Sequence, residues 1–261
     1  MVDHVTASIL TPVEDLEAEG PSSAPVPRLD EAAPAHRELP RLLAVWSDAD
    51  SSEEVELARI WVDLCARRAR VTDGFFTDHR CYLLLETAIG GDFGPPLTER
   101  QTEVLECVLV GQTQKAISID LALSAPRIAQ AVSSALKALG LCCKSSGLPM
   151  LLAMAAHARR TGQKGVGRTS RLKWAGRTYT VISVERPDRA LKHRLSESEY
   201  AVACTLVEGK THAEIAQLRG TSTRTVANQL STLFHKLKIS GRAELLALLA
   251  REAAGCAGAK C

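Results

Sequence analysis

The sequence has no apolar run long enough to cross a membrane. Its longest apolar stretch, LPMLLAMAA at 148–156, is far shorter than the roughly 20 residues that a membrane-spanning helix needs. The N-terminus is acidic and therefore lacks the basic start of a secretory signal peptide. We expect a cytoplasmic protein.

The sequence also lacks the cysteine spacing of a metal site or a disulfide framework. None of its eight cysteines forms a C-x-x-C pair, and no histidine stands at a matching distance. We therefore predict no metal and expect mostly buried or inert thiols. The cysteines are Cys65, Cys81, Cys107, Cys142, Cys143, Cys204, Cys256 and Cys261.

Motifs of common enzymes are missing as well. There is no H-E-x-x-H pair and no G-x-S-x-G nucleophile turn. The nearest match to a P-loop is GQKGVGRT at 162–169, but Arg168 replaces the lysine before Thr169. It also follows a predicted helix, whereas a phosphate-binding loop follows a buried strand. We predict no enzyme and no cofactor, and interpret this stretch as a flexible basic linker.

Charge is distributed unevenly along the chain. Residues 1–60 carry 13 acidic and 4 basic side chains, a net charge of −9, whereas residues 159–194 carry 2 acidic and 11 basic ones, a net charge of +9. A basic stretch beside a compact domain is typical of polyanion binding. A solvated basic linker is the alternative interpretation.

The first part of the chain divides into an acidic tail and a small structured segment. Residues 1–40 are rich in Pro, Ala, Ser and acidic residues without periodicity, so we expect a disordered tail. Within 41–96 we predict an amphipathic helix from Ser52 to Arg70, followed by a β-hairpin around TDH at 77–79. The apolar stripe of the helix comprises Val55, Leu57, Ala58, Trp61, Leu64 and Cys65.

The second half repeats this order. Residues 159–194 read as a basic linker plus a hairpin around Ala175 and Gly176, and residues 97–158 and 195–254 both read as helical units, before a short tail at 255–261. Matching residues lie 98 apart in the helical units and 97 apart in the hairpins. The pattern predicts an internal duplication of a hairpin plus a four-helix unit. The matches are Leu97 with Leu195, Val104 with Val202, Gly111 with Gly209, Thr113 with Thr211, Ile117 with Ile215, Ser124 with Ser222, Leu139 with Leu237, Arg80 with Arg177 and Tyr82 with Tyr179.

Helix-start signals define the helices of the second unit. Ser196 with Glu199 and Thr211 with Glu214 fit capping boxes, and Ser222 caps a longer third helix. Gly209 and Gly220 are placed to end the first two helices, and Ser240 opens a fourth. A short helix, a glycine turn and a helix with a polar outer face are typical of helix-turn-helix DNA binding. Val226, Leu230, Leu233 and Leu237 would face inward with Ile215 and Leu206.

Residues 195–250 resemble the C-terminal DNA-binding domain of the LuxR family in the pieces LSESEYAV, EGKTHAEIA, STRTVANQL and HKLKISGRAELLAL. Residues 97–157 look like a diverged second copy. The resemblance implies that the helix from Ser222 to Lys238 enters the major groove, with base contacts after Val226, while Lys210, Thr211 and Arg224 lie near phosphates. The implied DNA-binding residues are Lys210, Thr211, Thr223, Arg224, Thr225, Ala227, Asn228, Gln229, Ser231, Thr232 and Lys236.

This sequence departs from the family at two positions of the recognition helix. Ala227 stands where a lysine is common, and Gln229 replaces a frequent histidine. Asn228 and Gln229 retain the ability to pair with adenine, although a solvated helix face is the alternative for each side chain. In the first copy, Pro126 and the surrounding Ala and Ser residues leave a neutral surface, which favours a structural or dimerising role.

We therefore expect a mainly α protein with two small β-hairpins, acting as a DNA-binding transcription regulator. Double-stranded DNA is the expected partner, RNA polymerase is a further candidate, and the leucine-rich fourth helix suggests a homodimer. That helix carries Leu245, Leu246, Leu248 and Leu249, more apolar residues than one small core requires. The alternative is a protein-interaction adaptor whose helix-turn-helix units have lost DNA binding.

Overall fold

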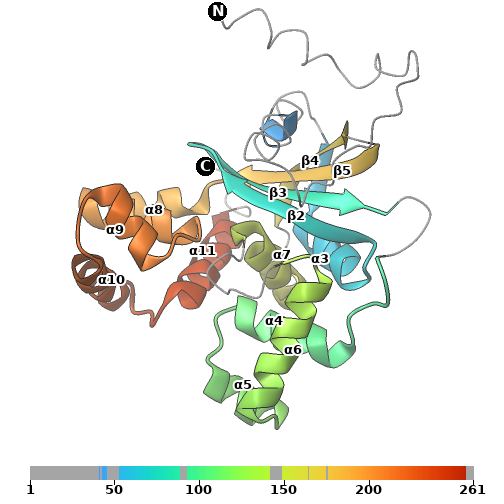
Figure 1. Cartoon of the computed structure of the whole chain (residues 1–261), viewed down its shortest axis with the longest axis horizontal. Coiled ribbons are helices and arrows are strands. Elements are labelled where there is room, and N and C mark those ends of the chain that lie inside the picture. The colour runs from blue at the N-terminus through green and yellow to red at the C-terminus, as the bar shows by residue number, and fades with distance from the viewer. Residues whose placement is uncertain are drawn as a thin grey trace, which may run out of the picture.

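The computed structural model describes residues 41, 43–45, 53–88, 93–141, 149–163, 165–174 and 176–256. For residues 254–256 it describes the backbone alone. In Figure 1 a sheet lies above one helical unit, a second unit lies to the left, and two helices lie side by side between the units. The predicted tail at 1–40 lies outside the described residues, as do Cys142, Cys143 and Cys261.

One five-stranded antiparallel sheet contains both predicted hairpins. Its strands are β1 (Glu53–Glu56), β2 (Ala69–Phe76), β3 (Arg80–Thr87), β4 (Val166–Trp174) and β5 (Arg177–Glu185), in the order β1-β4-β5-β3-β2. The central strands β3 and β5 bury consecutive residues on both faces, which is typical of strands covered from two sides. The two hairpins are therefore not separate elements, because β3 pairs with β5 and joins them.

Two sequence predictions are wrong in this region. Residues 53–56, predicted as the first turn of a helix, form β1, because they pair with residues 166–169 at the edge of the sheet. The helix α3 begins only at Leu57 and ends at Cys65. The stretch 162–169, predicted as a flexible linker, belongs in part to the sheet, because β4 already begins at Val166. The hairpin predicted within 159–194 is present as β4 and β5, and the 3-10 helix η3 (Pro187–His193) follows it.

The first helical unit follows β3. It comprises α4 (Glu99–Leu109), α5 (Gln114–Leu121) and α6 (Ala125–Ala138), and α7 (Met150–Thr161) comes after it. The hydroxyl oxygens of Thr98 and Thr113 accept hydrogen bonds from the third amide of α4 and α5. Ala116 has no side chain that could complete a capping box at α5, whereas Gln101 completes one at α4.

The second helical unit has the same order. It comprises α8 (Glu197–Val207), α9 (His212–Arg219), α10 (Thr223–Leu237) and α11 (Arg242–Cys256). The predicted capping boxes at Ser196 and Thr211 are both present, and the hydroxyl oxygen of Ser222 accepts from the Thr225 amide. Glu244 accepts hydrogen bonds from the amide and hydroxyl of Ser240 at the start of α11.

The two units share their turns as well as their caps. Left-handed backbone occurs at Gly111 and Gly209, at Ala122 and Gly220, and at Gly140 and Lys238, so each pair of residues is 98 apart. Such conformations disfavour side chains with a Cβ, and here they recur where each unit turns between helices. The two segments therefore follow similar backbone paths through three helices.

The helices α7 and α11 form the centre of the molecule (Figure 1). Residues 150–158 of α7 are all buried, and α11 buries Leu245, Leu246 and Leu249 in the same core. Leu248 is partly buried against that core. The chain itself therefore covers leucines that were expected to contact a second copy, and the homodimer stays a prediction. Among the residues described, none of the helices combines the length and the apolar character that a bilayer crossing requires.

Candidate nucleic-acid interface

The turn between α9 and α10 sets the angle at which α10 is presented. Gly220 adopts a left-handed conformation with φ of 61°, and no atom lies within 4 Å of where its Cβ would stand. The Thr221 amide donates to the carbonyl of Ala216, which closes the end of α9. Ser222 then caps α10. The arrangement is a helix-turn-helix, in which the second helix projects its outer face into solvent.

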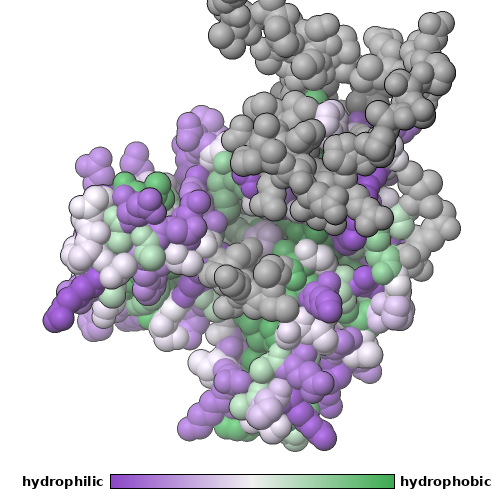
Figure 2. Space-filling model, in the orientation of Figure 1, coloured by the Kyte–Doolittle hydropathy of each residue, from purple (hydrophilic) through white to green (hydrophobic). Residues whose placement is uncertain are grey.

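The two faces of α10 differ as the sequence predicts. Its inner residues are buried, and its outer residues are exposed, so the predicted base-reading surface exists as an accessible polar strip. In Figure 2 the surface over α8, α9 and α10 is mostly hydrophilic to neutral. The inner residues are Val226, Leu230, Leu233 and Leu237, and the exposed predicted site residues are Thr223, Arg224, Thr225, Ala227, Asn228, Ser231, Thr232 and Lys236.

Two hydroxyls of this strip bond within the helix. Thr225 Oγ1 lies 2.8 Å from Ser222 Oγ and belongs to the cap. Thr232 Oγ1 donates to the carbonyl of Asn228 at 3.1 Å. The amide of the Asn228 side chain is exposed and has the donor and acceptor pair that adenine recognition needs.

Lys236 is already engaged in an ion pair. Its Nζ lies 2.7 Å from Glu199 Oε2, and Glu199 also completes the capping box of α8. The hydrogen bond from Lys236 and the bonds from Ser196 hold the pKa of Glu199 at about 2, so this carboxylate is ionised at neutral pH. The sequence does not reveal this pair, because the partners are 37 residues apart.

Gln229 does not face outward like its neighbours. It is half-buried, and its Nε2 lies 3.5 Å from the hydroxyl of Ser198 at the start of α8. Arg219 in the last turn of α9 donates to the same hydroxyl at 2.9 Å. Arg219 was not among the residues expected at the interface, although its place just before the glycine turn was a signal in the sequence that could have identified it. In this structure Gln229 helps to hold α10 against α8 rather than extend the polar strip.

The remaining predicted residues lie at the start of α9. Lys210 is half-buried, and Thr211 caps α9 by accepting from the Glu214 amide. The bonds that Glu214 receives from the backbone and hydroxyl of Thr211 lower the pKa of its carboxyl. Thr211 thus stabilises the start of α9, in addition to the DNA contact that the resemblance implies for it.

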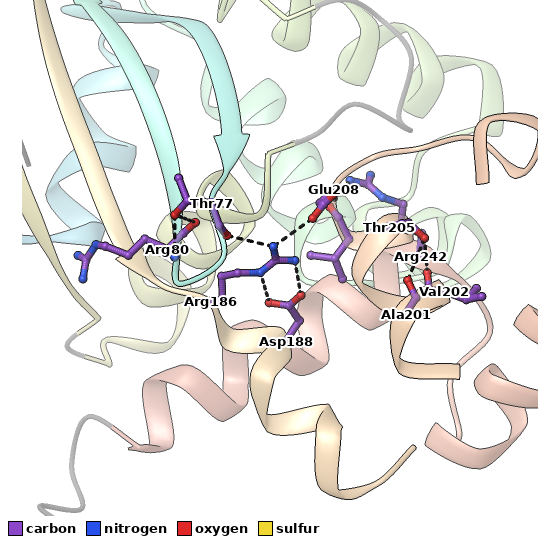
Figure 3. A network of polar contacts seen from close by, with 10 residues as sticks. Thr77, Arg80, Arg186, Asp188, Ala201, Val202, Thr205, Glu208 and Arg242 are labelled. Carbon is purple, nitrogen blue, oxygen red and sulfur yellow. Dashed lines mark hydrogen bonds and ion pairs between the residues drawn. The ribbon is translucent and has the colours of Figure 1, made fainter. Parts of the chain in front are cut away.

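Arg186 joins the second unit to the sheet (Figure 3). Its guanidinium forms two hydrogen bonds with Asp188, at 3.1 and 2.7 Å, and one with the backbone carbonyl of Thr77. A fourth bond of 3.0 Å reaches Glu208 after α8. Burial alone would lower the pKa of Arg186, but the two carboxylates outweigh it and raise the pKa. The C-terminal unit is therefore fixed to the hairpin turn at 77–79.

The equivalent surface of the first unit differs in charge. On α6, Pro126 occupies the position of Arg224, and Gln130 that of Asn228. The exposed residues near them are mainly Ala and Ser, together with Arg127 and Lys137. No group of three or more metal-ligating side chains occurs within the described part of the chain.

The comparison with known families agrees with this geometry. The exposed recognition helix on a glycine turn defines a helix-turn-helix domain, and residues 193–249 match the model of bacterial regulatory proteins of the luxR family. The C-terminal unit is therefore a LuxR-type DNA-binding domain of a transcription regulator. No curated protein and no solved structure matches the chain with significant similarity.

Proposed function

We propose that the protein is a sequence-specific transcription regulator that reads the major groove of duplex DNA with α10. The observation that carries the proposal is the exposed polar strip on α10, presented by the glycine turn after α9. Asn228 stands at its centre and supplies base discrimination, because a side-chain amide bonds adenine N6 and N7 together. Arg224 lies in the first turn of α10, where a cation positions the helix on phosphates.

The other predicted residues differ in the part of DNA that each could contact. Ser231 and Thr232 lie three and four residues after Asn228 on the exposed surface, Thr223 is exposed at the start of α10, and all three supply shorter polar contacts. Ala227 offers only its methyl group, which suits contact with a thymine methyl. Lys210 and Lys236 approach phosphates. To do so, Lys236 breaks its ion pair with Glu199.

The first unit serves as a scaffold in this proposal. Its α6 carries Pro126 in place of Arg224, and its outer face consists mainly of Ala and Ser, with Arg127 and Lys137 as its exposed cations. Similar caps and turns at a constant spacing favour a duplicated origin for the two units. Contact with RNA polymerase stays a prediction, since neither unit shows a surface specific for it.

One observation favours the adaptor alternative. Two of the predicted DNA contacts, Gln229 and Lys236, are held by α8 instead of being free for DNA. In an adaptor, α10 would serve as a protein-binding face and its polar strip would show no preference among DNA sequences.

Selection from a random duplex pool by the full chain separates these functions. A regulator enriches one motif, and Asn228→Ala reduces the preference at one base pair while binding to the unselected pool persists. Genome-wide mapping of bound sites then recovers the same motif. Failure to enrich any motif, together with an absence of binding at low salt, rejects the DNA-reading function and supports the adaptor.

A further inference from the structure

The two hairpins of the central sheet are paired as if a two-fold axis related them. The strands β3 and β5 run antiparallel, and Leu84 lies opposite Val181, residues that are themselves 97 apart. The outer strands obey the same relation, because Phe75 pairs with Tyr82 as Leu172 pairs with Tyr179. These six side chains pack in one buried cluster. The two hairpins therefore meet through equivalent residues, as the two halves of a symmetric dimer do.

The helical units also meet inside the chain. α7 follows the first unit, α11 is the last helix of the second, and the two helices pack against each other in the main core. The turn after α4 approaches α11 closely, since a Cβ on Gly111 would lie 3.0 Å from the Cβ of Ala247 and 3.1 Å from Glu244 Cα. The apolar face of α11 is thus occupied by the first unit.

We propose that the first unit takes the place of a second copy, so that the protein is an internally paired monomer and binds DNA as a single chain. The monomeric state stands on the packing alone, whereas binding as one chain rests on the proposed function.

Tethering explains why the internal pair prevails. A partner on the same chain has an effective concentration in the millimolar range, far above the concentration of a free second copy. The Arg186 contacts to Thr77 and Glu208 add a further link between the second unit and the sheet. A second copy would have to displace α7 from α11 before it could pair.

Sedimentation equilibrium of the full chain tests the proposal directly. We expect the mass of one chain at all concentrations up to about 100 µM, well below the effective concentration of the tethered unit. On a selected duplex with one site we expect one chain per duplex. A dimer in free solution overturns the pairing.

The two proposals fail in different ways. A monomer that binds no DNA keeps the internal pairing and rejects the proposed function. Two chains on a duplex that carries one site do the reverse, because they keep the DNA-reading function and overturn the single-chain complex.

A variant at the contact gives a second measurement. Gly111→Ala places a Cβ against α11 at a left-handed position, with φ of 81°, and should loosen the internal pair. We expect this chain to associate as its concentration rises. The matched control is Gly176→Ala, which has φ of 73° but nothing within 4 Å, and should stay monomeric. If folded Gly111→Ala stays monomeric as well, α11 is not the surface that the first unit covers, and the proposal is wrong.

Discussion

Replacing Glu199 by glutamine should strengthen DNA binding by releasing Lys236. In the free protein Lys236 Nζ lies 2.7 Å from Glu199 Oε2, so the lysine must break this pair before it contacts a phosphate. The equivalent residue of the first unit is Gln101, which completes the capping box of α4. Glu199→Gln therefore keeps both cap bonds of α8 and removes only the negative charge.

The size of the effect follows from exposure. The Lys236 side chain is 48% exposed, so solvent screens the pair and its contribution is about 0.2–1 kcal/mol. Removing that cost corresponds to a roughly 1.5- to 5-fold gain in affinity, since about 1.4 kcal/mol is tenfold. If the freed lysine then reaches one phosphate that it did not contact before, the log–log salt slope becomes more negative by about 0.9. With a Glu199 pKa of about 2, the original pair is intact at any pH suitable for the assay.

Fluorescence anisotropy with one selected duplex, repeated over a series of salt concentrations, measures both quantities. Glu197→Gln is the matched control, because Glu197 lies in the same first turn of α8 and is exposed, with no ion pair recorded for it in the described residues. It changes the net charge equally and should alter affinity less. The double variant Glu199→Gln with Lys236→Met should lose the gain. An unchanged affinity and slope for folded Glu199→Gln would refute a role for Lys236 at the DNA.

Three further outcomes are expected. Asn228→Ala should reduce discrimination by about 1–3 kcal/mol at one base pair, whereas Gln130→Ala should leave competition binding unchanged; an equal loss for both would show that the first unit reads DNA too. Arg224→Ala should weaken all sequences alike and make the salt slope about 0.9 less steep, and a loss confined to one base pair would contradict its phosphate role. Asp188→Ala should lower the free energy of unfolding by about 3 kcal/mol in urea titrations, because the side chain is fully buried and Arg186 keeps its charge; a change below about 1 kcal/mol would show that Glu208 suffices.

The helices of the second unit were predictable because their signals are local. Each capping residue acts within three or four residues of its partner, so Ser196 and Thr211 mark helix starts without knowledge of the fold. Gly220 marks the turn for the same reason, since its left-handed φ is a property of one residue.

The sheet was not predictable by the same means. β1 contains Glu53, Glu54 and Glu56, and its sequence continues smoothly into the stripe of α3. Only pairing with residues 166–169, more than 100 positions away, makes it a strand. The apolar run Cys81–Leu85 in β3 was an available signal for a central strand, whereas Thr180 and Ser183 interrupt the apolar residues of β5, and neither sequence identifies the partner strand.

The exposed face of α10 was predictable from the sequence, whereas its contacts with α8 were not. The exposed positions of α10 follow from helical periodicity, which separates Asn228 from Val226 and Leu230. The contacts of Gln229 and Lys236 with the start of α8 depend on how two helices pack. No spacing rule within one helix reveals them.

The basic stretch at 159–194 shows why summed charge overstates a binding surface. Its net charge of +9 predicts strong attraction to a polyanion, yet several of its arginines serve the fold. Arg177 pairs with Glu86, Arg186 with Asp188 and Glu208, and Arg194 with Glu252. An arginine engaged with a carboxylate releases no counterion unless that pair breaks first. The stretch therefore offers DNA less charge than its sum indicates, although Arg168, Arg171 and Lys192 remain exposed.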